Sequence, residues 1–302
     1  EQRMSHSEAG RRRRAPRTAA LCLLLLFGGA LSERSLAQEA DAPAPEVSRA
    51  GVPLSLPSVL KSEVRRYVLD GKSILSAPLH WDGESWTQAA AAVVSVGLVM
   101  REDSRIDASL QHNRSSRTDS FSRAVTPLGS SAGIGVSIAA LGGGLLFRNA
   151  ELRDTGRDAV EAEILAAGIV TPILKKAAGR LRPSQGSDAD EYQPLSRGQS
   201  FPSGHSTEAF AVASVIAARS EGWAVPALAY ALASGVAFAR MNDRAHFASD
   251  VVAGAIIGTA IGHSVVHRHS SDGGKASAWN LVPIPARRGA GIGIRLETGS
   301  RP

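Results

Sequence analysis

The chain of 302 residues has an apolar share of 43% and a formal net charge of +6, so it can bury a sizeable core as one large domain or two small ones. The excess positive charge lies at the N-terminus, because residues 1–37 hold seven of the 34 basic residues and three of the 28 acidic ones. The remaining 27 basic and 25 acidic residues nearly balance, and they form no Lys/Arg stripe with interleaved aromatic residues. Nucleic acid is therefore not an expected partner.

Residues 1–37 have the pattern of a signal peptide. A basic run over residues 11–17 precedes an apolar stretch over residues 19–31, and small residues follow up to Ala37. The apolar stretch is shorter than the roughly 20 residues that span a bilayer, although an uncleaved membrane anchor is the alternative. The only cysteine, Cys22, lies inside this segment, so the mature chain would have no disulfide and no thiol chemistry. We expect an exported, periplasmic protein.

The rest of the chain is predicted to be helical up to its C-terminal tail. Residues 38–57 are rich in Ala, Pro, Glu and Ser and are expected to form a flexible leader. Residues 58–270 carry apolar, Ala/Gly-rich segments separated by polar stretches, which predicts an all-α fold, a bundle of about six helices. These segments cover residues 86–100, 132–147, 159–174, 207–218, 223–239 and 251–266. In the tail, residues 271–302, two segments (279–284 and 291–296) flank a Pro/Arg/Gly turn and predict a short β-hairpin.

The apolar segments are short for membrane helices. Most have about 12–18 residues, whereas a bilayer requires roughly 20. Several contain or adjoin acids or histidine, such as Glu161, Glu208 and His263, and Ala and Gly dominate where Leu and Phe would give firm insertion. The composition favours a soluble or peripherally membrane-associated protein, with an integral membrane protein as the alternative.

The first of three motifs is Lys175-x6-Arg182-Pro183. Lys175 and Arg182 are close to two helical turns apart, so both can point from one helix face before Pro183 stops the helix. Taken alone, the pair also fits a basic helix C-terminus that complements the helix dipole. Their neighbours Lys176 and Arg180 are expected to face elsewhere and to belong to that helix end.

The second motif is Pro202-Ser203-Gly204-His205, just before an apolar segment. Ser203 suits a helix N-cap, and Gly204 lets the backbone come close to a ligand. A helix N-terminus offers N–H groups and partial positive charge to an anion, with His205 at its mouth; a plain capping turn is the alternative. The connection over residues 184–201 is long for a helical bundle, as lids and substrate-reading loops often are.

The third motif is Arg240-x5-His246-x3-Asp250. His246 and Asp250 are predicted to share one helix face within hydrogen-bond reach. A carboxylate on one ring nitrogen fixes the tautomer and makes the other nitrogen a better nucleophile or base. Arg240 adds a planar fork suited to phosphate oxygens, whereas Arg244 fits a solvated loop charge. A surface His–Asp pair is the alternative for this motif alone.

Together the motifs supply three cations, two imidazoles, a carboxylate and a Ser-Gly turn, which is the inventory that a phosphoryl group needs. In this order, within about 75 residues, they resemble the signature of the type 2 phosphatidic acid phosphatase and vanadium haloperoxidase superfamily. That signature reads Lys-x6-Arg-Pro, Pro-Ser-Gly-His and Ser-Arg-x5-His-x3-Asp. The resemblance covers about residues 86–267 and implies the acid phosphatase/vanadium-dependent haloperoxidase fold. Ala239 departs from it, since the family usually has serine before the arginine.

The resemblance implies a metal-independent phosphohydrolase without a cofactor, which cleaves a phosphomonoester or a lipid phosphate or diphosphate through a phosphohistidine. His246 would attack phosphorus, Asp250 would orient it, and His205 would protonate the leaving oxygen and then help activate water. The phosphate oxygens would be bound by Lys175, Arg182, Arg240, Ser203 and Gly204. No metal is expected, because the three cations already neutralise the phosphate.

Two other functions stay open. A vanadate-dependent haloperoxidase would use the same pocket, since vanadate mimics the trigonal-bipyramidal phosphoryl state, but the compact spacing of the motifs favours the phosphatase. A non-catalytic membrane or binding protein would need only the cations, so the intact histidines and aspartate argue against it. The expected partners are a phosphorylated small molecule or lipid and a membrane surface; no protein partner is implied.

Three further histidines, His263, His267 and His269, lie at the end of the last long helix. The first two have metal-ligand spacing, but no carboxylate or cysteine nearby completes a site. We interpret them as a solvated helix end.

Overall fold

The computed structural model of the protein describes residues 53–54, 56–186, 188–196, 198–271, 277–286 and 289–298. The predicted signal segment, residues 1–37, and most of the predicted leader lie outside these residues. Within the last residues of that leader, the structure has a two-residue strand, β1 (Pro53–Leu54), and the start of helix α2.

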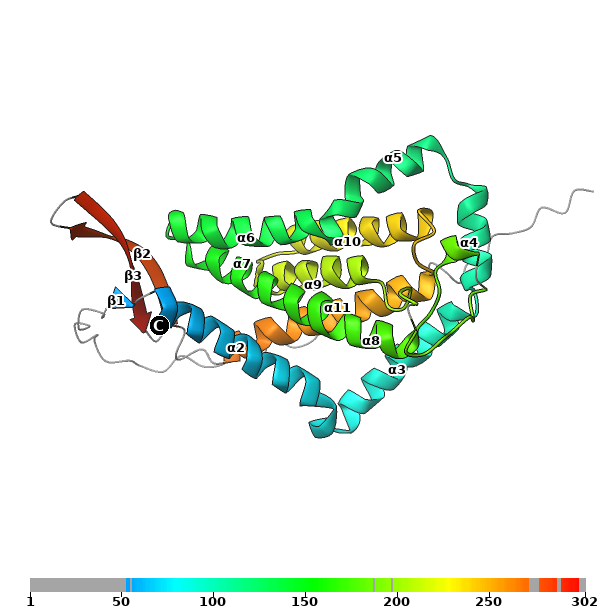
Figure 1. Ribbon diagram of the computed structural model, residues 1–302, viewed down its shortest axis with the longest axis horizontal. Coiled ribbons are helices and arrows are strands. Elements are labelled where there is room, and N and C mark those ends of the chain that lie inside the picture. Colours follow the sequence, from blue (N-terminus) through cyan, green and yellow to red (C-terminus); the bar gives the residue numbers. More distant parts are fainter. Residues whose placement is uncertain are drawn as a thin grey trace, which may run out of the picture. The chain divides into compact units, whose positions relative to one another are not determined.

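The described residues confirm the predicted all-α bundle (Figure 1). The α-helices are α2 (Leu56–Ser76), α3 (Gly83–Met100), α4 (Asp103–His112), α5 (Ser116–Val125), α6 (Ser131–Leu146), α7 (Ala150–Glu163), α8 (Thr171–Ala178), α9 (Gly204–Arg219), α10 (Ala224–Asn242) and α11 (Ala248–Ser271). A π-helical segment, η4 (Ile164–Val170), joins α7 to α8, and short 3-10 turns are η2 (Ala77–His80), η3 (Thr126–Gly129) and η5 (Pro183–Gln185). Each of the six predicted apolar segments falls on these helices to within one residue at either end.

The bundle has more helices than the six predicted, because α2, α4 and α5 lie outside the six predicted segments. α4 and α5 are short and polar, so their composition gives no apolar run to find, and local capping supports α5. Ser115 precedes α5 in a capping box: Thr118 N donates to Ser115 Oγ at 3.3 Å, and Ser115 N donates to Thr118 Oγ1 at 3.0 Å. Such reciprocal bonds satisfy the donors that a helix N-terminus leaves without internal partners.

The predicted C-terminal hairpin is present, with longer strands than expected. Strands β2 (Ser277–Ala286) and β3 (Gly289–Thr298) pair antiparallel, with Trp279 opposite Leu296 and Ala286 opposite Gly289. β1 pairs with the other edge of β3, so the sheet order is β1-β3-β2.

α9 contacts α6, α7, α10 and α11, and its closest partner is α11 (Figure 1). Three glycines at four-residue intervals on α11 make this contact: Gly254, Gly258 and Gly262. A Cβ atom on Gly258 would lie 2.2 Å from the backbone oxygen of Thr207, and one on Gly262 would lie 2.5 Å from that of Ala211. Real Cβ atoms never approach so closely, so the two backbones touch only because these positions are glycine.

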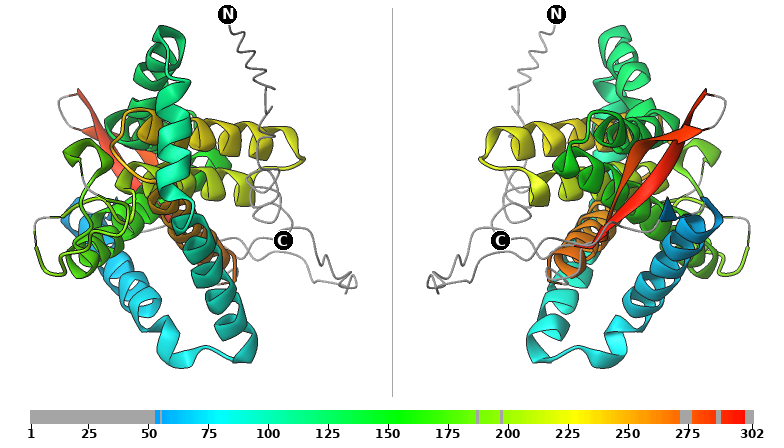
Figure 2. Two further views of the ribbon diagram at one scale, coloured as in Figure 1. Left: turned by 90° about the vertical axis from the view of Figure 1, so that its right-hand side faces the viewer. Right: turned by 90° about the vertical axis from the view of Figure 1, so that its left-hand side faces the viewer.

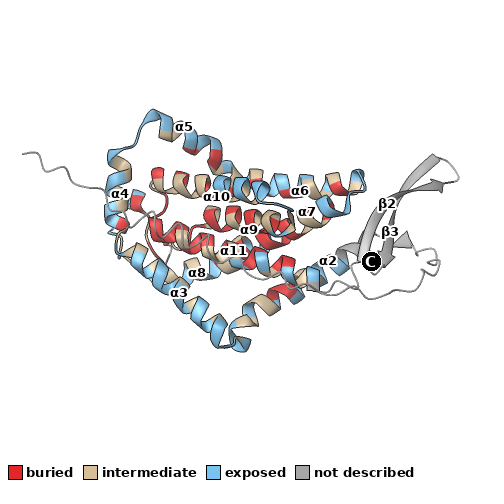
Figure 3. Cartoon of the chain, turned by 180° about the vertical axis from the view of Figure 1, so that it is seen from behind, coloured by how far each residue is buried: buried red, intermediate tan, exposed pale blue. Residues whose placement is uncertain are grey.

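Small side chains also form most of the core. One buried cluster joins Ala159, Ala162 and Leu165 to Ala211 of α9 and Val265 of α11. Figure 3 shows that buried residues concentrate in α7, α9 and α11, whereas α3 has none. An alanine-rich core fixes short distances between helices, because little side-chain volume separates the backbones.

Several outer helices expose large apolar side chains. On α10, Val225, Leu228 and Leu232 are 50%, 62% and 45% exposed, and on α3 Val93 is 72% exposed. Figure 2 shows α3 (cyan) and α2 (blue) as a V-shaped pair at the edge of the bundle. Exposed apolar surface of this extent marks a contact with another apolar phase or partner.

Two helices in the described residues are long and apolar enough to cross a membrane: Ala224–Asn242 and Ala248–Ser270. The bent pair of Ser116–Gly129 and Ser131–Leu146 would count as a third if it forms a single span. The prediction that the apolar runs are too short is therefore wrong for α10 and α11, because each helix extends beyond its apolar run, α10 through Arg240 to Asn242 and α11 from Ala248 to Ser271. The finding supports membrane association.

We expect Gly258→Ala to destabilise the protein by about 1–3 kcal/mol, the usual cost of overpacking, because the added methyl group would push α11 away from α9. Thermal unfolding followed by circular dichroism would measure the loss. Gly142→Ala in α6 is the matched control: nothing lies within 4 Å of its added Cβ, so it should be neutral or stabilise the helix by up to about 1 kcal/mol. Equal midpoints for the two variants would contradict the close contact of α9 and α11.

Candidate active site

The structure brings the three motifs together at one end of the bundle, where α8 and α10 end and α9 and α11 begin. Ser203 N donates to the backbone oxygen of Asp250 at 2.9 Å, which ties the second motif to the third. Ser184 N donates to the backbone oxygen of Arg244 at 2.9 Å, which ties the end of the first motif to the third. The backbone itself therefore holds the three sequence segments in register.

Lys175 lies on α8, but Arg182 lies beyond it. The helix ends at Ala178, because Gly179 adopts a left-handed conformation (φ +61°) as its C-cap, and Arg182 is extended. The prediction of one helix face ending at Pro183 is thus wrong: a glycine C-cap acts first. The half-buried Lys175 Nζ donates to the backbone oxygen of Gln199 at 2.5 Å.

Ser203 is the N-cap of α9, as predicted, and Gly204 is the first helical residue. The buried Ser203 Oγ accepts from Ser206 N at 3.4 Å. Gly204 faces the first motif, since a Cβ atom built on it would lie 3.9 Å from Cε of Lys175. The positive end of α9 and the Lys175 side chain therefore point at the same place, and His205 stands in the first turn beside them.

His246 and Asp250 approach each other without sharing a helix. His246 lies in the connection before α11, and Asp250 lies in the first turn of α11. The prediction of an i,i+4 helical pair is therefore wrong, although the atoms still come within 3.7 Å (His246 Nδ1 to Asp250 Oδ2). At this distance the buried Nδ1 has no hydrogen-bond partner among the residues that the structure describes. The orientation leaves Nε2 as the nitrogen turned away from the carboxylate.

Arg240 lies in the last turn of α10, half-buried, with Nη1 3.8 Å from Asp243 Oδ2. Arg244 forms an ion pair with Asp107 at 3.0 Å and is 42% exposed, in line with its predicted place in a loop. Of the two arginines, Arg240 is the one whose charge acts on Lys175, a predicted phosphate-binding residue, and on His205, a predicted catalytic residue.

Burial first, and neighbouring cations second, lower the pKa values of Lys175, His205 and His246. Burial, followed by the charges of Arg182 and Arg240, lowers the pKa of Lys175 to about 8. Burial, followed by Arg240 and the other cations, lowers the pKa of His205 to about 4. Burial also lowers the pKa of His246 to about 4, although Asp250 opposes the shift. This concentration of positive charge favours the binding of an anion with two negative charges between these side chains.

Sequence reasoning missed Arg180, which was assigned to an outward-facing helix end. In the structure its side chain is fully buried, and Nη1 donates to Asp250 Oδ1 at 2.7 Å. Ser200, from the long connection, donates to Asp250 Oδ2 at 2.5 Å. The signal that could have located Arg180 is Gly179: a residue after a glycine C-cap leaves the helix surface and can turn inward.

The long connection between the first two motifs packs against the end of α8. Gln193 N donates to the backbone oxygen of Gly179 at 3.1 Å, Leu195 N to that of Lys176 at 2.9 Å, and Ser200 N to that of Arg180 at 2.9 Å. The connection therefore packs along the end of the first motif and places Ser200 within hydrogen-bond distance of Asp250.

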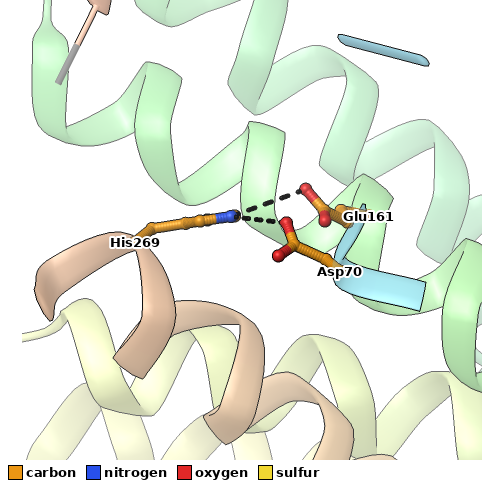
Figure 4. Close-up of side chains that lie close together, drawn as sticks. All are labelled: Asp70, Glu161 and His269. Atoms are coloured by element: carbon orange, nitrogen blue, oxygen red, sulfur yellow. Dashed lines mark hydrogen bonds and ion pairs between the residues drawn. The ribbon is translucent and has the colours of Figure 1, made fainter. Parts of the chain in front are cut away.

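A second group of titratable side chains surrounds His269 at the far end of α11 (Figure 4). His269 Nδ1 lies 2.7 Å from Asp158 Oδ1, while Nε2 lies 3.2 Å from Asp70 Oδ2 and 3.9 Å from Glu161 Oε2. The interpretation of His269 as a solvated helix end is wrong, because α2 and α7 bring carboxylates from distant parts of the sequence. His263 and His267 stack with ring centroids 6.5 Å apart.

Arginines pair with the same carboxylates: Arg268 with Asp70, Arg219 with Asp158, and Arg66 with Glu161. The group is thus a charge-compensated network that fastens α2 and α7 to α11, and we assign it no role in chemistry.

Residues 161–272 match the PAP2 superfamily. The LpxE structure from Aquifex aeolicus is 23% identical, covering 55% of this chain and 94% of that one with a TM-score of 0.44. A transmembrane PAP2 type phosphatidylglycerolphosphate phosphatase from Bacillus subtilis is 21% identical, covering 70% of this chain and 95% of that one with a TM-score of 0.46. Among curated proteins, none matches the sequence.

The match to the PAP2 superfamily includes all three motifs and confirms the resemblance predicted from them. It also agrees with the prediction of a phosphatase.

The site should bind oxyanions less tightly as the pH rises through about 8. Lysine attracts an anion only while protonated, and the pKa of Lys175 is lowered to about 8. We expect the Kd for tungstate, whose charge is constant over this range, to increase about tenfold above that pH, since one charge-assisted hydrogen bond contributes roughly 1.5 kcal/mol. Calorimetric titration at several pH values would measure it.

Lys175→Arg is the control for this titration, because arginine stays charged across the range. Its tungstate affinity should change little around pH 8. An equally steep loss in Lys175→Arg would show that another group controls the binding.

Proposed function

We propose that this protein, whose residues 161–272 belong to the PAP2 superfamily, is a phosphohydrolase that works through a phosphohistidine. The observation that supports the proposal is that backbone hydrogen bonds from Ser203 to Asp250 and from Ser184 to Arg244, with Gly204 close to Lys175, bring three basic and histidine-containing segments together. Positive charge placed before the substrate arrives stabilises the charge that develops on a transferring phosphoryl group.

In the first step, Nε2 of His246 attacks phosphorus and the bond from phosphorus to the leaving oxygen breaks. His205 donates a proton to that oxygen, and Asp250 compensates the positive charge that forms on the His246 ring. In the second step, His205 accepts a proton from water, which attacks the phosphohistidine and releases phosphate. A bound dianion raises the low pKa of His205, because it cancels the surrounding cations, and so prepares His205 to act as the acid.

The phosphate oxygens are assigned to Lys175, Arg182 and Arg240 together with the N-terminus of α9. Ser203 holds that N-terminus as its N-cap, and Gly204 brings its backbone within reach of the same anion. Because these residues supply the neutralising charge, we propose that hydrolysis needs no metal ion and persists with a chelator.

A lipid phosphate or diphosphate is the substrate class that we favour over a soluble phosphomonoester. Two features support it: the apolar surface of α3 and α10, and an apolar groove between α2 and the π segment, lined by Val68, Leu75 and Ile169 among others. Ile169 precedes Lys175 by about 9 Å along one continuous helical run. We infer that a substrate whose phosphate lies at Lys175 extends an apolar tail toward this groove. We further propose an exported protein that works at the periplasmic face of a membrane.

The rival function, a vanadium-dependent haloperoxidase, predicts a different assay result. Halide oxidation with hydrogen peroxide and added vanadate, together with the absence of p-nitrophenyl phosphate hydrolysis, would contradict the phosphatase. A purely phosphate-binding protein would show neither activity while still binding tungstate.

We expect His246→Ala to reduce hydrolysis by at least about a thousandfold, since removal of a nucleophile leaves only binding and electrostatic effects. Tungstate binding should persist in part, because the three cations remain. Assays with p-nitrophenyl phosphate and with a lipid phosphate in detergent would measure the loss of hydrolysis. Calorimetric titration would measure the tungstate binding. Turnover that survives in His246→Ala would contradict the phosphohistidine mechanism.

His205→Ala should affect substrates according to their leaving groups. A poor leaving group, such as a lipid alcohol, needs the proton and should lose about 100–10,000-fold in the first step, the usual contribution of general acid catalysis. p-Nitrophenolate leaves without a proton, so the first turnover should persist as a burst and the phosphohistidine should accumulate. Rapid-quench kinetics with both substrates would measure the difference; equal losses would contradict the role of His205 as the acid.

A further inference from the structure

Arg180 joins two buried carboxylates from opposite sides. Nη1 donates to Asp250 Oδ1 at 2.7 Å, and Nη2 donates to Asp103 Oδ2 at 2.7 Å. All three side chains are fully buried. We refer to Asp103, Arg180 and Asp250 as the buried ladder; it ends at His246, which lies 3.7 Å beyond Asp250.

Ser249 braces the ladder from the adjacent position on α11. Its Oγ accepts from Arg180 Nη1 at 2.7 Å and donates to Asp103 Oδ2 at 2.5 Å, while its backbone N–H donates to Asp103 Oδ1 at 2.9 Å. Asp103 is thus fixed by both its oxygens. A carboxylate 77 residues before Arg180 in sequence determines where the guanidinium plane lies.

Asp250 has little freedom once the ladder is formed. Oδ1 accepts from Arg180, and Oδ2 accepts from Ser200 Oγ at 2.5 Å and from Phe247 N at 2.8 Å. The ring of Phe247 also covers the guanidinium, 4.3 Å from its central carbon. Three charge-assisted hydrogen bonds give the carboxylate one orientation.

We propose that Arg180 is a positioning residue of the active site, which sets the orientation and charge of Asp250 and, through it, the reactivity of His246. Arg180 reaches no phosphate, because its side chain is fully buried and its two Nη atoms donate to the ladder carboxylates, to Ser249 Oγ and to the backbone oxygen of Ala189. The inference rests on the proposed function, in which His246 is the nucleophile.

The charges along the ladder explain why an arginine suits this place. Asp250 alone would make His246 more basic, and a protonated His246 cannot attack phosphorus. Arg180 offsets the field of Asp250, and Asp103 in turn offsets Arg180. The other charged or titratable groups that act on His246 are Lys175, Arg182 and His205, and Tyr192 faces Arg180. Among the described residues, the acidic groups that bond to the guanidinium are these two carboxylates, so substitutions at Arg180 and at Asp103 should shift the pKa of His246 in opposite directions.

The test compares Arg180→Met with Asp103→Asn in the full-length protein, using p-nitrophenyl phosphate. We expect kcat to fall about 100-fold in Arg180→Met and about tenfold in Asp103→Asn, since small misplacements of a catalytic group cost up to about 100-fold. KM and the Kd for tungstate should stay within about threefold of wild type, because no phosphate contact is removed.

The pH dependence separates positioning from a merely structural role. In Arg180→Met, Asp250 is no longer offset, so the pKa of His246 rises and the acid limb of kcat/KM moves to higher pH. In Asp103→Asn, Arg180 offsets Asp250 more strongly, so the acid limb moves to lower pH. Arg180→Lys keeps the charge but not the fork that bridges two carboxylates, so it should recover the pH profile and only part of kcat.

Arg219→Met is the matched control, because it breaks another buried ion pair, with Asp158, at the far end of the bundle. It should lower the melting temperature as much as Arg180→Met without changing kcat or the pH profile. If the ladder variants lose stability but keep wild-type kcat and pH limbs, the positioning role of Arg180 is wrong while the proposed function stands.

Two further outcomes are decided by the same assays. If Arg180→Met does not fold, Asp103→Asn and Arg180→Lys test the proposal in its place. Asp103→Asn should move the acid limb to lower pH, and Arg180→Lys should keep the wild-type pH profile with a reduced kcat. If the wild-type protein hydrolyses no phosphate ester, the proposed function is wrong and the role of Arg180 falls with it.

Discussion

The contact between the backbones of α9 and α11 is the constraint on which the rest of the structure depends. Gly254, Gly258 and Gly262 place no side chain of α11 against the backbone of α9 where the two helices approach most closely, so the N-termini of the two helices lie side by side. Ser203 N can then bond directly to the backbone of Asp250. With larger residues between the helices, the N-terminus of α9 and the Asp250 carboxylate would lie too far apart to form one site, even with the same three motifs.

The eight proposed site residues could be selected from the sequence because they stand in three short motifs whose order resembles a known signature. Ser203 as N-cap and the apolar run behind it follow from propensities that operate over one helical turn. Where prediction depended on exact helix ends it failed: Gly179 ends α8 before Arg182, and α11 begins after His246. A regular spacing of residues indicates a shared face only if the helix actually continues through it.

The buried ion pairs could not be predicted from the sequence for a different reason. Arg180 and Asp103, like His269 and Asp70, are ordinary surface-type residues in sequence, and only the packing of distant helices makes them interior. A buried charge is costly unless it is paired, so each such residue implies a partner somewhere in the chain. The sequence alone does not say where that partner is, since the pairs are separated by 77 and 199 residues.

The direction of the helices has a topological consequence. α9 runs away from the site, α10 returns to it, and α11 runs away again, so α8 and α10 end where α9 and α11 begin. From Asp250 to His269 the axis of α11 covers about 28 Å, close to the roughly 30 Å of a hydrocarbon core. In a bilayer that α10 and α11 cross, the phosphate pocket would open to one leaflet and the charged network of His269 would lie at the other. Sidedness of substrate uptake and phosphate release would then be built into the fold.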